Sequence, residues 1–285
     1  MTRKTLLLTG GSGYLGQHIS LKAVERFTLF TGYNRRVDQI MAGQPVALNL
    51  TDQVETLRVI GELKPQAIIH AAAVNPGDGD AEAMRLMNEQ GARYVAEAAV
   101  AVGARLVHVS TDVVHDGRHA PYTDEASPTP LNAYGQSKAA GEAMVRTVDP
   151  QAAIVRTSLI YGLSVMDRGT AGFIERLKSG QKLVLFNDVI RQPVWVETLA
   201  EALLRLVDVD FSGLLNVVGR QALTREEFGR RMLAWWGVEA GDLVQSGRAA
   251  DISDTIPLDL RLTVDKAEQL LQMTFPGVDE VITRQ

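Results

Sequence analysis

The amino-acid sequence predicts an α/β fold, in which a doubly wound parallel sheet is covered by helices on both faces and carries a smaller C-terminal lobe. Three observations support this prediction. Short apolar runs alternate with helical patterns through the first half of the chain. A glycine-rich loop joins the first run to the first helical segment. The second half loses the regular alternation, which indicates a separate substructure.

Composition and charge reduce the classes of function that we expect for the protein. The chain has 285 residues and a formal net charge of −5, so neither its size nor its charge suggests nucleic acid as a partner. No apolar stretch approaches the roughly 20 residues of a membrane span, and we expect no membrane partner. Cysteine is absent, which excludes disulfides and thiolate catalysis and is compatible with the cytoplasm. The histidines lack metal-ligand spacing, so we expect no metal site.

The predicted elements follow in order along the chain. Runs typical of buried strands are Leu6–Leu8, Phe27–Thr31, Val46–Leu50, Ala67–His70, Arg105–Ser110 and Ala153–Thr157. Helical segments between them are Leu15–Arg26, Val54–Leu63, Ala81–Val102 and Tyr134–Thr147. We place a cofactor-binding domain at residues 1–160, with later segments near 183–218 returning to it, and a substrate-binding lobe at residues 161–182 and 219–285.

The loop after the first strand carries the cofactor prediction. Glycines at positions 10, 13 and 16 allow a tight turn, close approach of a pyrophosphate and close helix–strand packing. The helix that follows offers free N–H groups and a positive dipole end to phosphates. This context predicts a Rossmann-type dinucleotide site formed by Gly10, Gly13, Tyr14, Leu15 and Gly16.

The end of the second predicted strand indicates which dinucleotide binds. A carboxylate usually stands there and binds the ribose 2′-hydroxyl. Here the segment contains Asn34, Arg35 and Arg36 and no acid. Because guanidinium groups attract a 2′-phosphate, the sequence favours NADP(H) over NAD(H).

A tyrosine and a lysine at helical spacing indicate the chemistry. Tyr134 and Lys138 are four residues apart and therefore share a helix face. A nearby ammonium lowers the pKa of a phenol, which is ordinarily about 10, and makes it an efficient proton donor. The fifth predicted strand ends near Thr111, at the sheet edge where ligands bind in such folds. Together the three groups predict a site that protonates and polarises a carbonyl oxygen.

Two segments resemble a known family. The stretches 110–117 (STDVVHDG) and 130–142 (PLNAYGQSKAAGE) are similar to those of the dTDP-4-dehydrorhamnose reductase family, extended short-chain dehydrogenases/reductases that reduce a 4-keto nucleotide sugar. The resemblance is close from the glycine loop to Gly162, looser near Arg191, and weak thereafter. It implies catalytic roles for Thr111, Tyr134 and Lys138, with Tyr134 and Lys138 also binding the cofactor.

The resemblance implies further site residues. Ala71, Ala72 and Ala73 match the small-residue strand end that lines the cofactor, where His70 replaces the usual Asn. Asn49 and Leu50 fall where relatives contact the adenine, although relatives often carry Asp at the position of Asn49. Thr111, Asn75 and Arg191 are the expected substrate contacts. Related enzymes often pair through helices at the positions of 81–102 and 134–147, so we also expect a homodimer.

Alternatives to keto reduction remain. A nucleotide-sugar dehydratase needs an acidic pair after the catalytic Thr, but Asp112 is followed by Val113. An epimerase uses the same Tyr and Lys and stays open. A different class also stays open, a non-catalytic NADP-binding regulatory subunit like that of methionine adenosyltransferase. The leading hypothesis is an NAD(P)H-dependent reductase of a keto group on a sugar or sugar nucleotide.

Overall fold

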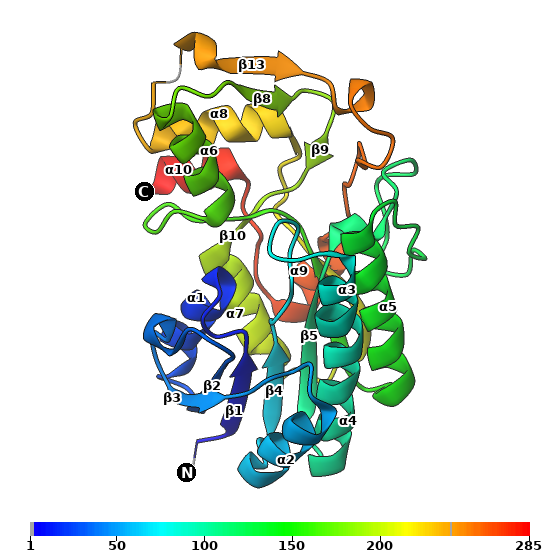
Figure 1. The fold of residues 1–285 in the computed structure, drawn as a ribbon. Helices are drawn as coiled ribbons and strands as arrows, with labels where there is room; N and C mark the ends of the chain where they lie inside the picture. The colour runs from blue at the N-terminus through cyan, green and yellow to red at the C-terminus, as the bar shows by residue number, and fades with distance from the viewer. Residues whose placement is uncertain (1–2, 240) are drawn as a thin grey trace. The chain divides into compact units, whose positions relative to one another are not determined.

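A computed structural model describes residues 3–239 and 241–285, and its chain divides into two compact units (Figure 1). Unit 1 comprises residues 1–111, 133–156 and 199–215. Unit 2 comprises residues 112–132, 157–198 and 216–285. The chain therefore crosses between the units several times, and the second unit includes the segment directly after Thr111.

Unit 1 is built on a seven-stranded sheet with strand order β11-β6-β5-β4-β1-β2-β3. The pairs β1–β2, β2–β3, β1–β4 and β4–β5 are parallel. In this order β2 and β3 extend the sheet on one side of β1, and β4, β5 and β6 extend it on the other. This is the Rossmann arrangement and confirms the predicted fold class. The strands are β1 (Thr5–Thr9), β2 (Thr28–Tyr33), β3 (Gln44–Ala47), β4 (Ala67–His70), β5 (Arg105–Thr111), β6 (Ala153–Thr157) and β11 (Gly213–Val217).

Helices cover both faces of this sheet (Figure 1). One group packs on the apolar side chains of β1, β4, β5 and β6 and forms a continuous core with them. It consists of α2 (Gln53–Leu63), α4 (Ala92–Val102) and α5 (Ala133–Val148). Alanines on the buried face of α4 let it approach both the sheet and α5 closely. On the opposite face lie α1 (Tyr14–Ala23) and α7 (Val196–Leu206).

Two predicted elements differ from the structure. The single helix expected over 81–102 is divided into α3 (Ala81–Met84), a π-helical turn η2 (Arg85–Gly91), and α4. Asn88 lies in this turn and its amide group bonds both the N–H and the C=O of Val74, at 2.8 and 2.9 Å. That tertiary contact accompanies the widened turn, as is common for π-helical insertions at functional sites. The third strand ends at Ala47, before the expected Leu50.

Unit 2 is made of short elements around two small cores. Its strands pair as β7 (Ile160–Tyr161) with β10 (Val194–Trp195), β9 (Ile190–Arg191) with β12 (Leu223–Thr224), and β8 (Leu183–Phe186) with β13 (Val244–Gly247). Its helices are α6 (Arg168–Lys178), α8 (Arg225–Trp235), α9 (Asp265–Leu271) and α10 (Val278–Arg284). Of the later segments near 183–218, residues 199–215 belong to unit 1, whereas β8 lies in unit 2.

Candidate active site

The glycine loop packs so tightly that side chains cannot replace its glycines. Gly10 has φ +72°, and a Cβ there would lie 2.6 Å from the backbone N of Ala72. A Cβ on Gly16 would lie 2.2 Å from the carbonyl oxygen of Gly10. Gly13 is the N-cap of α1 and has no side chain to occupy the first N–H groups of that helix. The loop thus leaves a cradle at a helix N-terminus, which fits a dinucleotide pyrophosphate.

The residues expected beside this cradle are near it in unit 1. Ala71, Ala72 and Ala73 follow β4 and are partly exposed, and the Gly10 loop contacts the backbone of Ala71 and Ala72. Asn34, Arg35 and Arg36 directly follow β2 and are exposed. The guanidinium groups of Arg35 and Arg36 are therefore accessible to a ligand at the end of this strand.

The two positions after β3 have different environments. Asn49 is partly buried, and its side-chain oxygen accepts hydrogen bonds from the backbone N–H and the hydroxyl of Thr51, at 3.2 and 2.8 Å. Leu50 is 4% exposed and belongs to the core of unit 1. The side chain of Leu50 thus packs against the protein, and only its backbone remains to contact an adenine.

The catalytic triad candidates come from β5 and α5. Lys138 is 2% exposed, and its Nζ donates a hydrogen bond of 2.7 Å to the carbonyl oxygen of Val109. This bond fixes the Lys138 face of α5 against the C-terminal end of β5, where Thr111 ends the strand and is 7% exposed. Tyr134 lies one turn earlier on the same helix and is partly exposed. Burial lowers the pKa of Lys138 to about 8, opposed by the charge of Glu142.

A buried ion pair between α5 and β6 stabilises this arrangement. Glu142 and Arg156 are 2% and 0% exposed and join α5 to β6, with Arg156 Nη2 donating to Glu142 Oε2 at 2.8 Å. Ser110 Oγ also donates to Glu142 Oε1, at 2.6 Å. The Ser110 hydroxyl is therefore engaged within the protein. Sequence reasoning assigned no role to Glu142, because its partners are distant along the chain.

Two buried histidines lie side by side in the sheet of unit 1. His70 and His108 occupy paired positions on β4 and β5, with ring centroids 5.1 Å apart. Thr9 Oγ1 and His70 Nδ1 form a hydrogen bond of 2.7 Å, whereas His70 Nε2 and both nitrogens of His108 lack a hydrogen-bond partner within residues 3–239 and 241–285. Burial, together with the charge of Lys138, lowers the pKa of His70 to about 3. Both rings are consequently neutral.

The other two expected substrate contacts, Asn75 and Arg191, have different environments. Asn75 is exposed, in the loop after β4. Arg191 lies on β9 in unit 2 and forms a two-pronged ion pair with Asp112, at 2.7 Å through Nε and 2.5 Å through Nη2. Ser158 donates a further hydrogen bond of 2.6 Å to Asp112. Asp112 is thus a fully buried anchor that orients Arg191.

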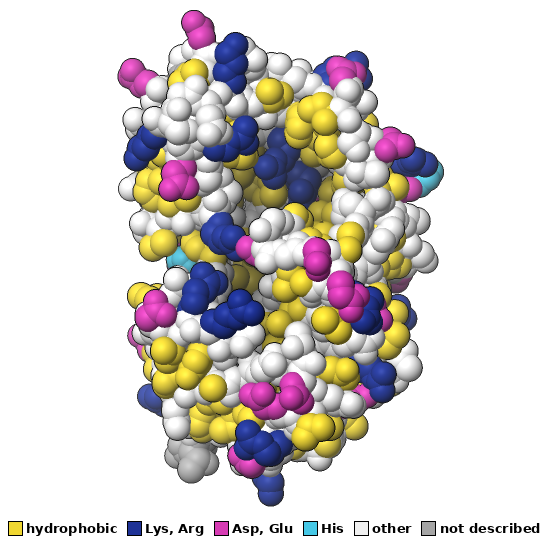
Figure 2. Space-filling view, in the orientation of Figure 1, with side chains coloured by type: hydrophobic (Ala, Val, Ile, Leu, Met, Phe, Trp, Pro, Cys, Tyr) yellow, Lys and Arg dark blue, Asp and Glu magenta, His cyan; other side chains and the backbone are white. Residues whose placement is uncertain are grey.

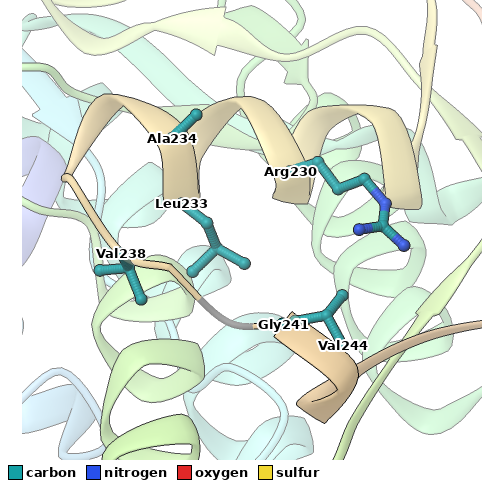
Figure 3. Close-up of a pocket in the computed structure, with 6 residues that line it drawn as sticks. All are labelled: Arg230, Leu233, Ala234, Val238, Gly241 and Val244. Carbon is teal, nitrogen blue, oxygen red and sulfur yellow. The ribbon is translucent and has the colours of Figure 1, made fainter.

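The described residues give less support for a metal site, a membrane span or a second ligand pocket. In the described ranges 3–239 and 241–285, no three His, Asp or Glu side chains gather as metal ligands. None of the helices described is both long and apolar enough to cross a membrane. A shallow hollow in unit 2 lies between α8 and the segment leading into β13 (Figure 3). Its side chains are mainly apolar, with Arg230 at one side, so it lacks a convergent set of reactive groups.

The fold, the glycine cradle and the Tyr–Lys helix together define an NAD(P)-dependent oxidoreductase of the extended short-chain dehydrogenase/reductase type. More narrowly, the chain belongs to the family described as the RmlD substrate binding domain, whose model matches residues 4–271.

The chain is similar to relatives with two kinds of name, a reductase and a subunit of another enzyme. The dTDP-4-keto-6-deoxy-D-glucose reductase of Streptomyces niveus is 32% identical over 82% of this chain and 80% of its own length. The methionine adenosyltransferase 2 subunit beta of Xenopus tropicalis is 30% identical over 78% of this chain and 69% of its own length.

Solved structures share the fold. A dTDP-4-dehydrorhamnose reductase from Bacillus anthracis in complex with NADP has a TM-score of 0.83 and 24% identity, with 100% of this chain and 98% of that one covered. The Bordetella bronchiseptica enzyme WbmH in complex with NAD⁺ has a TM-score of 0.84 and 21% identity, with 98% and 96% covered. Structures of this fold thus bind either nicotinamide dinucleotide.

Proposed function

We propose that this protein reduces a keto group on a sugar or sugar nucleotide, with NADPH as the preferred reductant. The observation that carries the proposal is the bond from Lys138 to the end of β5, which holds the Tyr134 helix beside Thr111. Family membership and the S. niveus reductase support a nucleotide sugar as the substrate.

The residues of this chain have distinct tasks in the proposed reaction. NADPH, when bound, supplies the hydride that reduces the carbonyl carbon. Tyr134 donates its phenolic proton to the carbonyl oxygen, and the ammonium of Lys138 stabilises the phenolate that remains. Thr111 donates a second hydrogen bond to the same oxygen, which polarises the carbonyl before reduction.

The cofactor preference rests on the end of β2. Gly10, Gly13 and Gly16 form the pyrophosphate cradle, flanked by Tyr14 and Leu15. Ala71, Ala72, Ala73, Asn49 and Leu50 are the proposed neighbours of the remaining cofactor. Arg35 and Arg36 would bind a 2′-phosphate, which NADPH carries and NADH lacks. The exposure of both side chains supports this assignment.

We further propose that unit 1 binds the cofactor and that unit 2 selects the substrate. Asn75 and Arg191 are the proposed contacts of the substrate. A homodimer and a cytoplasmic location complete the proposal. The absence of cysteine agrees with a reducing compartment. Sedimentation tests the dimer, since a species of 31.0 kDa at micromolar concentration would contradict it.

A second candidate is a binding subunit without turnover, which the similarity to the X. tropicalis subunit favours. The test is NADPH absorbance in the presence of dTDP- and UDP-linked 4-keto sugars. Keto reduction predicts stoichiometric loss of absorbance with an alcohol product. Binding of NADPH without turnover on any of these ketones would favour the binding subunit, and isomerised sugar at constant absorbance would favour an epimerase.

A further inference from the structure

One arginine in unit 2 has no hydrogen-bonded carboxylate among the described residues. Arg225 is the first residue of α8, directly after the N-cap Thr224, and is partly buried. Its guanidinium lies over the ring of Phe173, with 6.0 Å between Cζ and the ring centroid. Within the described part of the chain, its guanidinium forms no hydrogen bond or ion pair.

This placement is unfavourable for a structural residue. The N-terminus of a helix carries a partial positive charge, so a cation in the first turn is repelled rather than stabilised. Burial, together with the neighbouring charge of Arg191, lowers the pKa of Arg225 to about 10, against the attraction of Asp167 and Asp112. The free protein therefore holds two guanidinium groups close enough to repel each other.

The nearby carboxylates are committed to other partners. Asp167 caps α6 and accepts hydrogen bonds from the backbone N–H and the hydroxyl of Thr170, at 2.9 and 2.6 Å. Asp112 is bound by Arg191 and Ser158. Among the described residues, the guanidinium of Arg225 therefore has no hydrogen-bonded carboxylate. The Nη1 atom of Arg191 has no hydrogen-bond partner there either.

Figure 2 shows Lys and Arg side chains inside a hollow beside the region of β9 and α8. We propose that Arg225, together with the Nη1 edge of Arg191, binds an anionic group of the substrate and selects charged over neutral sugars. A guanidinium presents a planar fork of N–H donors that matches the oxygens of a phosphate or carboxylate. The inference rests on the proposed function and specifies its substrate class.

Two substrate groups share this chemistry, the diphosphate of a sugar nucleotide and the carboxylate of an acidic sugar. Calorimetric titration with dTDP, UDP, thymidine and glucuronate separates them. The parent protein should bind dTDP or UDP, or glucuronate, and should bind the uncharged thymidine much more weakly. An affinity for none of the anions would overturn the proposal.

The variant Arg225→Met removes the charge and keeps an apolar stem. It should weaken binding of the anion roughly 10- to 100-fold, the range of a charge-assisted hydrogen bond. Arg225→Lys should retain part of the affinity, because it keeps the charge and loses the fork. The matched control is Arg230→Met on the same helix, where the guanidinium is exposed and already paired with Glu226 at 2.8 Å. That control should bind as the parent does.

The melting temperature distinguishes recognition from a structural role. Removing an unpaired, partly buried charge should leave the melting temperature of Arg225→Met equal to that of the parent or raise it. Equal anion affinity in parent and Arg225→Met, or a lowered melting temperature in this variant, would overturn the assignment. NADPH oxidation with a neutral ketone is measured in parallel. Its persistence in Arg225→Met would show that keto reduction holds even where anion recognition fails.

Discussion

The lowered pKa of Lys138 predicts how the reaction depends on pH. Burial is the main cause of the shift, from 10.5 to about 8. With that pKa, the side chain is about nine-tenths charged at pH 7 and about one-tenth charged at pH 9. In the proposed mechanism this charge stabilises the Tyr134 phenolate, so the rate of keto reduction should fall about tenfold between these two values.

The assay is single-turnover oxidation of NADPH at saturating cofactor, from pH 6 to 10, with an accepted ketone. Lys138→Arg is the informative variant, because an arginine stays charged throughout this range. In that variant the overall rate should be lower, since the longer group displaces the contact with the Val109 carbonyl. The decline above pH 8 should disappear.

Two results would refute the reasoning. A parent rate that stays constant from pH 7 to 10 would show that the charge of Lys138 does not control the reaction. A decline that persists unchanged in Lys138→Arg would assign the titration to another group.

Three other perturbations give distinct readouts. Glu142→Gln removes the carboxylate charge that faces the buried guanidinium of Arg156, which should cost about 3–5 kcal/mol and lower the melting temperature by about 6–10 °C; a loss under about 2 °C in calorimetry would contradict the assigned pairing. Burial holds the pKa of His108 well below 6.5, so the stability given by its neutral form is complete above pH 6.5 and is lost as the pH falls below it. His108→Leu should therefore reduce the loss of unfolding free energy between pH 7 and 5 by about 2 kcal/mol, and urea titrations of equal pH dependence would exclude this. Arg35→Ala should weaken NADPH binding roughly 10- to 100-fold and leave NADH binding unchanged; tighter binding of NADH than NADPH by the parent would reject the cofactor preference.

The central sheet is largely predictable from the sequence. The run Leu6–Leu8 is wholly buried in β1, because a parallel strand covered on both faces must be apolar on both sides. The glycine loop is predictable for a similar reason, since its backbone contacts leave no space for a Cβ at Gly10 or Gly16.

The parts that escape prediction depend on contacts between distant residues. The π-helical turn coincides with a bond from Asn88 to Val74, and periodicity alone predicts an unbroken helix there. Helical spacing places Tyr134 and Lys138 on one face, but it does not reveal the bond from Lys138 to Val109. In sequence, Arg225 is an ordinary cation at the start of a helix. Its lack of a partner becomes visible when Asp112 and Asp167 are seen to be bound elsewhere.

The central claim is that Tyr134 delivers the proton to the substrate carbonyl. Tyr134→Phe removes the hydroxyl alone, and NADPH titration should give nearly the parent affinity. Single-turnover NADPH oxidation should slow by about 10²–10⁴-fold, the usual contribution of a positioned general acid. Thr111→Val should slow it less, because Tyr134 still contacts the oxygen. A Tyr134→Phe variant that binds NADPH and reduces the ketone at the parent rate would contradict the mechanism.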